Sequence, residues 1–236
     1  EAAQALRQLL PVEMVLQTQV PRDGIFVRAS AKGLPVGVLE DGVGAQAVFD
    51  GLRAEIEANG GAAHVVQLDV TDYASIKSAL AHAETEAGHI DILVNNSGVS
   101  STQRLVDVTP EDYAHVMDTN LRGAFFVAQE AAKRMIQRAK AEPHRQHRII
   151  NIASVAGLRV LSQIGVYCMS KAGAVQMTKA MALEWGRYGI NVNAICPGFF
   201  PSKMTHGLLE KLGADKMAAG APLRRLGDDE DLKGLA

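Results

Sequence analysis

Short apolar segments alternate with longer helical patterns along most of this chain, and this alternation is the feature that most narrows its possible folds. The apolar segments are too short for helices and end at turn residues, so they predict buried strands. Strands separated by helices pair in parallel, with the helices covering both faces of the sheet. We therefore predict a doubly wound α/β fold with a parallel sheet. The expected strands are 64–68, 90–94, 148–153 and 190–195, and the expected helices are 52–59, 73–87, 110–117, 121–139 and 166–188.

Polar or turn-forming residues follow the predicted strands directly. Asp69, Asn96, Ser154 and Pro197-Gly198 each come just after a strand. Ligands of open α/β sheets bind in the crevice outside the carboxyl ends of the strands. We expect these residues to converge on one crevice.

Ser154, Tyr167 and Lys171 suggest the chemistry of that crevice. A phenol and an ammonium four residues apart lie on one face of a helix. The positive charge favours the phenolate, so we expect Lys171 to lower the pKa of Tyr167 from about 10. A phenol tuned in this way can donate and accept a proton. Because the Ser154 hydroxyl can bind the reacting oxygen, the set predicts carbonyl–alcohol chemistry with a hydride carrier.

Composition excludes several other classes of protein. The 236 residues suffice for one domain with a sizeable core. A formal net charge of −2 argues against nucleic acid and anionic membranes as partners. No apolar run reaches the roughly 18 residues of a membrane span, and no signal peptide is apparent. The two cysteines, Cys168 and Cys196, form neither a disulfide framework nor a metal quartet, and we expect them to be small core residues. A reducing cytoplasm is the expected location.

Six motifs resemble those of the short-chain dehydrogenase/reductase family, in its order and at its spacing, from about Leu52 to Asp231. The resemblance extends to 3-oxoacyl-reductase-like and sugar or alcohol dehydrogenase-like members. It implies one Rossmann-type domain over 1–236, which is a three-layer sandwich with a substrate loop at 199–226. It also implies a homotetramer or dimer that assembles through the helices 121–139 and 166–188. The motifs are Leu68-Asp69-Val70, Asn95-Asn96-Ser97-Gly98, Asn120, Ser154, Tyr167 with Lys171, and Pro197-Gly198.

The resemblance also implies a role for each residue. Tyr167 is expected as general acid/base and Ser154 as the group that polarises the substrate carbonyl. Lys171 is expected to bind the nicotinamide ribose, and Asn120 to position a water that links Lys171 to solvent. Hydride exchange with NAD(P) requires no metal. The expected cofactor contacts are Asp69, Val70, Asn96, Ser97 (where the family usually has alanine), Gly98, Tyr167, Lys171, Pro197, Gly198, Phe200 and Ser202.

Each motif has a simpler interpretation when taken alone. Asn95 and Asn96 could end a strand, and Asn120 or Asp69 could cap a helix. Pro197-Gly198 could be an ordinary turn. Six unrelated turns would not keep the family's spacings, so we favour the joint interpretation.

The chain departs from the family at the glycine-rich turn that approaches the cofactor pyrophosphate. That turn should fall near 15–22, where no glycine is present and Pro21 removes an amide donor. Either this segment has diverged, or the recorded sequence is wrong here, for example through a reading-frame slip. The abrupt return of resemblance near Leu52 favours the second explanation, and 1–51 matches poorly. The alternative function is a catalytically silent dinucleotide-binding or scaffold protein.

Three further observations bear on the cofactor and the substrate. Residues 42–47 fit G-x-G-x-x-A, but the spacing from Asp69 to Asn95-Asn96 favours the family's third and fourth strands instead. Glu40 and Asp41 follow a presumed second strand and favour NAD over NADP, because a carboxylate repels a 2′-phosphate. Apolar residues in 199–212 suggest a substrate with an apolar part, or a helix packed on the core.

The family's last strand is expected beyond residue 236.

Overall fold

The computed structural model describes residues 50–51, 53–54, 56–58, 60–201, 205, 209, 213–228 and 231–232. The chain divides into two compact units, one formed by Glu1–Gln67 with Phe199–Ala236 and the other by Leu68–Gly198. The expected glycine turn at 15–22, the segment 40–47 and Ser202 lie outside the described residues. A single domain over 1–236, with 199–226 as a substrate loop, stays a prediction.

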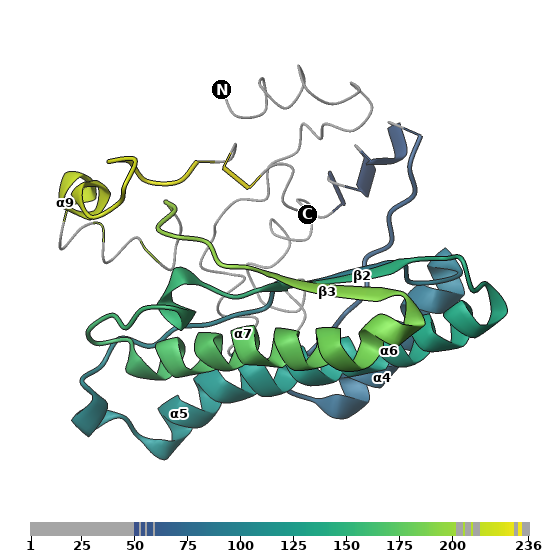
Figure 1. Ribbon diagram of the computed structural model, residues 1–236, viewed down its shortest axis with the longest axis horizontal. Helices are drawn as coiled ribbons and strands as arrows, with labels where there is room; N and C mark the ends of the chain where they lie inside the picture. The colour runs from purple at the N-terminus through teal and green to yellow at the C-terminus, as the bar shows by residue number, and fades with distance from the viewer. Residues whose placement is uncertain are drawn as a thin grey trace. The chain divides into compact units, whose positions relative to one another are not determined.

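The unit Leu68–Gly198 contains a parallel sheet of three described strands in the order β1-β2-β3 (Figure 1). In the register, Val94 of β1 pairs with Ile150 of β2, and Ile150 pairs with Asn193 of β3. The strands are β1 (Ile92–Asn95), β2 (His147–Ile152) and β3 (Ile190–Ile195), and the helices are α4 (Tyr73–Ala87), α5 (Pro110–Met117), α6 (Ala124–Ala141) and α7 (Gly165–Trp185). The predicted alternation is confirmed for these elements.

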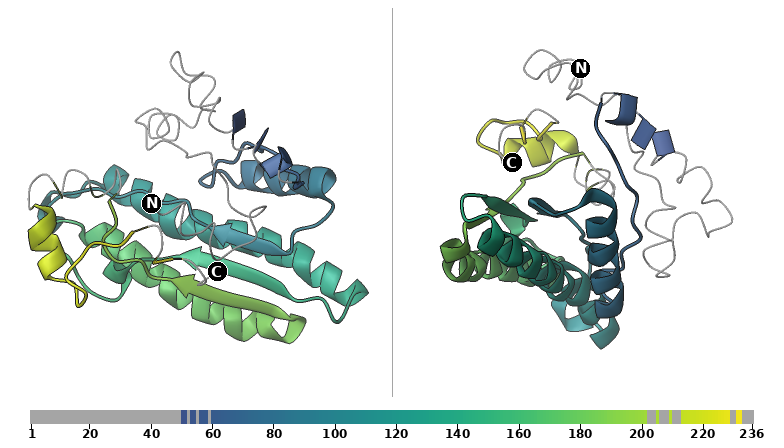
Figure 2. Two further views of the ribbon diagram at one scale, coloured as in Figure 1. Left: turned by 90° about the horizontal axis from the view of Figure 1, so that it is seen from above. Right: turned by 90° about the vertical axis from the view of Figure 1, so that its right-hand side faces the viewer.

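Helices α6 and α7 cover one face of this sheet, and α4 packs against α6 (Figures 1 and 2). Alternate strand residues such as Ile149 and Val192 face these helices and are buried beside Met135 and Met181. The intervening residues of β1 and β3 point to the other face, and Val94 there is 54% exposed. Within this unit the described helices α6 and α7 therefore cover the face of Ile149 and Val192, in keeping with the predicted α/β fold.

Local sequence signals account for the helix boundaries. The Asp72 side chain caps α4 by accepting hydrogen bonds from the backbone N–H groups of Ala74 and Ser75. Thr109 caps α5, and Pro110 occupies its first turn, where a missing N–H costs nothing. A π-helical turn, η4 (Asp118–Gly123), joins α5 to α6, so the predicted helix 121–139 begins later than expected.

The predicted strand at 64–68 is wrong in this structure, which shows no regular secondary structure there. An extended segment becomes a strand only when its N–H and C=O groups pair with a neighbour. None of the described strands pairs with these residues.

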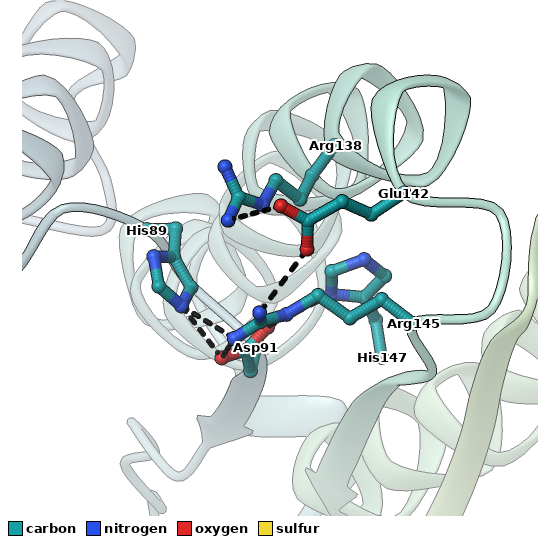
Figure 3. Close-up of polar contacts among 6 residues, drawn as sticks. All are labelled: His89, Asp91, Arg138, Glu142, Arg145 and His147. Carbon is teal, nitrogen blue, oxygen red and sulfur yellow. Dashed lines mark hydrogen bonds and ion pairs between the residues drawn. The ribbon is translucent and has the colours of Figure 1, made fainter.

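A cluster of charged side chains surrounds the start of β2 (Figure 3). Arg145 donates hydrogen bonds to both carboxylate oxygens of Asp91, at 2.6 and 2.5 Å. His147 is fully buried, with its Nδ1 3.5 Å from Asp91 Oδ1, and among the described residues neither ring nitrogen has a hydrogen-bond partner. Burial lowers the pKa of His147 below its usual value, so its neutral form is favoured. The cluster comprises His89, Asp91, Arg138, Glu142, Arg145 and His147.

We expect His147→Leu to remove part of the pH dependence of stability between pH 7.5 and 5.5. The unfolded chain protonates this ring near pH 6.5, whereas the folded chain resists protonation, so stability falls as the pH drops below that value. One such proton contributes at most about 1.4 kcal/mol per pH unit. Asp91 stays ionised in this range, because the hydrogen bond from Arg145 lowers its pKa. Urea unfolding at both pH values checks the expectation, which an unchanged slope would contradict.

Candidate active site

The carboxyl ends of the three strands meet at one edge of the sheet. Hydrogen bonds continue the ladder past the strands, from Ala153 N to Ile195 O at 2.8 Å and from Val155 N to Pro197 O at 2.9 Å. Asn96, Ser154 and Pro197 therefore leave the sheet at the same edge, as the sequence predicted for these positions.

Ser154 lies in a tight turn that packs against α7. Its hydroxyl caps the short 3-10 helix η5 (Val155–Gly157) by accepting a hydrogen bond from Ala156 N at 3.1 Å. A Cβ at Gly157 would lie 2.6 Å from the carbonyl oxygen of Lys171, so only glycine permits this approach. The close packing brings Ser154 within hydrogen-bonding reach of the Tyr167 hydroxyl.

Lys171 lies one helical turn after Tyr167 and is 4% exposed. Its Nζ is 5.8 Å from the centroid of the Tyr167 ring and donates a hydrogen bond to Ile152 O at 2.7 Å. That is the only hydrogen bond of this ammonium to the described residues, although an ammonium carries three N–H donors. Burial lowers the pKa of Lys171 to about 8.

The expectation that Lys171 lowers the pKa of Tyr167 is wrong in this structure. Burial raises that pKa above its usual value of 10.0, and the hydrogen bond with Ser154 offsets only part of this effect. The Lys171 ammonium lies over the face of the ring and donates to Ile152 rather than to the phenol. Helical spacing brought the two residues together, but burial decided the direction of the shift.

Asn120 is 2% exposed and lies in the π-helical turn η4. Its side chain binds the loop after β1 through two hydrogen bonds of 2.8 Å, one from Val99 N to Asn120 Oδ1 and one from Asn120 Nδ2 to Val99 O. Its Nδ2 also donates to the hydroxyl of Ser170 at 3.0 Å. Ser170 was not among the site residues predicted from the sequence, although its position three residues after Tyr167 places it on the same face of α7.

Gly98 lies beside the side chains of Lys171 and Asn120. A Cβ at this position would lie 3.4 Å from Lys171 Nζ and 3.5 Å from Asn120 Oδ1. The glycine therefore keeps open the region between the ammonium and the carboxamide. A Cβ at Gly198 would meet no atom within 4 Å.

These features fit a dinucleotide. A buried ammonium with two spare donors suits the adjacent hydroxyl oxygens of a ribose, which act as acceptors. Gly98 leaves backbone close to Lys171 without a side chain in between. Tyr167, Lys171 and Gly98 would hold the nicotinamide half of such a cofactor.

The remaining predicted cofactor contacts are spread more widely. The Asp69 carboxylate accepts hydrogen bonds from Thr71 N and Thr71 Oγ1, at 2.8 and 2.7 Å, and the helix cap is Asp72. Val70 is buried, and a Cβ at Gly123 would lie 2.5 Å from its carbonyl oxygen. Neither is shown in contact with Tyr167 or Lys171.

Three other predicted contacts are at the surface or in the other unit. Asn96 and Ser97 are exposed in the loop after β1. Phe200 belongs to the other compact unit, where its carbonyl oxygen accepts a hydrogen bond from Thr205 Oγ1 and its ring leaves no room for a Cβ at Gly227.

Residues 43–236 match the protein family described as enoyl-(acyl carrier protein) reductase. A sorbitol dehydrogenase from Cereibacter sphaeroides is 38% identical over 198 residues, covering 80% of this chain and 75% of that protein. This chain belongs to the short-chain dehydrogenase/reductase family. It is therefore an oxidoreductase with an NAD(P)-binding Rossmann fold that acts on CH–OH groups.

Solved structures of relatives support the fold. A gluconate 5-dehydrogenase from Burkholderia cenocepacia J2315, in complex with NADP and tartrate, is 30% identical, with a TM-score of 0.74 over 90% of this chain and 82% of that one. An NAD+-bound xylitol dehydrogenase is 28% identical, with a TM-score of 0.73 over 80% of this chain and 77% of that one. No helix in the described part of the chain combines the length and apolar character that crossing a membrane requires.

Proposed function

We propose that this short-chain dehydrogenase/reductase interconverts a secondary alcohol and a carbonyl, with Tyr167 as general acid/base. The observation that carries the proposal is the buried Lys171 ammonium beside the Tyr167 ring, with the Ser154 hydroxyl near enough to the phenol to lower its pKa. A nicotinamide dinucleotide would accept or supply the hydride.

The protein side chains then handle the proton. For oxidation, the Tyr167 phenol first releases its own proton to solvent along the Lys171 and Asn120 path. The resulting phenolate then takes the proton of the alcohol, which Ser154 orients by a hydrogen bond. Lys171 holds the cofactor ribose with the donors that Ile152 leaves unused. Asn120 positions a water between Lys171 and solvent, using the region beside Gly98. Reduction reverses each transfer.

The proposed substrates are polyols, sugars or sugar acids. Their chemistry is that named for the sorbitol dehydrogenase, the xylitol dehydrogenase and the gluconate 5-dehydrogenase. Because one of the two solved relatives holds NAD+ and the other NADP, they do not select between the cofactors. The preference for NAD rests on Glu40 and Asp41, which lie outside the described residues.

Assembly and location are proposals as well. The tetramer implied by the resemblance would form through α6 and α7. In its support, α7 carries exposed apolar side chains, with Met169 47% and Leu183 86% exposed. The cytoplasm remains the proposed location.

Titration with NADH and NADPH, followed by oxidation assays on sorbitol, xylitol and gluconate, tests the proposed function. We expect at least one cofactor to bind with micromolar affinity. With one or more of the substrates, we also expect the absorbance of the reduced nicotinamide to increase as the alcohol is oxidised. Binding of neither cofactor, together with no turnover, would favour the silent scaffold, because the expected glycine turn is missing from 15–22.

A further inference from the structure

Ser170 connects the turn that carries Asn120 to the helix that carries Tyr167 and Lys171. It is fully buried in α7. Its hydroxyl donates a hydrogen bond to the Tyr167 carbonyl oxygen at 2.8 Å and accepts one from Asn120 Nδ2 at 3.0 Å. Both its donor and one acceptor position are therefore used, which fixes the direction of the hydroxyl.

These bonds leave the Asn120 carboxamide with one orientation. Its two N–H donors go to Val99 O and Ser170 Oγ, and its oxygen accepts from Val99 N. An amide oxygen has two acceptor positions, so one stays unused. That oxygen is 3.5 Å from the point where a Gly98 Cβ would lie, and Lys171 Nζ is 3.4 Å from the same point.

We propose that Ser170 is a positioning residue, whose hydroxyl holds the Asn120 carboxamide with its oxygen toward the space between Gly98 and Lys171. Val99 fixes the carboxamide to the loop after β1, whereas Ser170 fixes it to α7, the helix of Tyr167 and Lys171. Without this bond, a buried N–H of Asn120 loses its partner and the carboxamide loses its anchor to that helix. The inference rests on the proposed function, because it assigns Ser170 to the proton path of that site.

The same helix offers a matched control in Thr178. Its hydroxyl donates to Ala174 O at 2.8 Å and accepts from Asn151 Nδ2 at 3.0 Å, so it makes the same pair of bonds as Ser170. Thr178 is likewise buried. Removing either hydroxyl leaves one buried asparagine N–H without a partner, so Ser170→Ala and Thr178→Val should lower stability to a similar extent.

Steady-state kinetics of the full chain separate positioning from stability. For Ser170→Ala we expect kcat to fall about tenfold, KM for the dinucleotide to change less than twofold, and the pH profile of kcat to shift. Thr178→Val should lower the melting temperature as much as Ser170→Ala does, but it should keep the wild-type kcat and the wild-type pH profile. Equal effects of the two variants on kcat would overturn the proposal.

A double-mutant cycle shows whether Ser170 acts through Asn120. In an Asn120→Ala background, Ser170→Ala should lower kcat by less than twofold, because the carboxamide that it positions is already gone. A full tenfold loss in that background would refute the proposal. An inactive wild-type chain would instead refute the proposed function, so the two failures are distinguishable.

Discussion

Tyr167→Phe should lower turnover by about a thousandfold or more while the affinity for the dinucleotide changes by less than threefold. General acid–base catalysis by a positioned group contributes roughly 10²–10⁴ in rate. The variant removes one hydroxyl and keeps the ring over which Lys171 lies. Because the Lys171 ammonium donates to Ile152 and not to the phenol, its capacity to bind a ribose should survive.

The measurement pairs single-turnover hydride transfer with fluorescence titration of the dinucleotide. Tyr188→Phe is a suitable control, since Tyr188 lies beyond the far end of α7 from Tyr167, in the 3-10 helix η6 (Gly186–Tyr188), and should keep full activity. Turnover that persists at wild-type rate in Tyr167→Phe would remove Tyr167 from the mechanism. Loss of both turnover and binding would instead indicate a structural role for the hydroxyl.

Lys171→Met should abolish turnover and, in the absence of cofactor, stabilise the protein by about 3 kcal/mol at pH 7. The reason is that burial lowers the pKa of Lys171 from 10.5 to about 8, so the folded protein holds an ammonium with few partners. Each unit of such a shift corresponds to about 1.4 kcal/mol. Methionine has a similar length and carries no charge that must be desolvated.

The size of this effect depends on pH in a way that can be tested. The folded pKa lies below the unfolded one, so the penalty is complete below about pH 8 and disappears as the pH rises toward 10.5. Urea unfolding should show the largest gain of Lys171→Met at pH 7 and a smaller gain at pH 9.5. Lys179→Met, at an exposed position of the same helix, should change stability little at either pH. Destabilisation at pH 7 would contradict the expectation.

The expected loss of turnover and gain of stability in Lys171→Met reflect a compromise between function and stability at this residue. A buried, poorly paired ammonium is costly, and groups with strongly shifted pKa values concentrate at functional sites. Lys171 keeps spare donors in a buried position, where a bound ribose would meet little competition from water. The stability that the folded chain loses there is available as binding free energy for the cofactor.

The sequence by itself predicted the parallel α/β architecture, and it placed several residues of the candidate site near one another. Alternating strands and helices indicated the parallel arrangement of β1, β2 and β3, because parallel strands need long crossover connections, which are usually helices. Helix spacing placed Tyr167 and Lys171 on one face of α7, and strand order placed Ser154 at the edge where the Asn96 loop also begins. These are local rules that a linear sequence carries in full.

Only the tertiary structure decided the direction of the electrostatics and the polar connections. The pKa of Tyr167 rises rather than falls because the fold buries the phenol and turns the Lys171 ammonium toward Ile152, which no spacing predicts. The bond from Asn120 to Ser170 likewise joins residues fifty positions apart, in a π-helical turn and a separate helix. Desolvation and hydrogen bonding depend on which groups the packed chain brings together, and that information appears only after the chain folds.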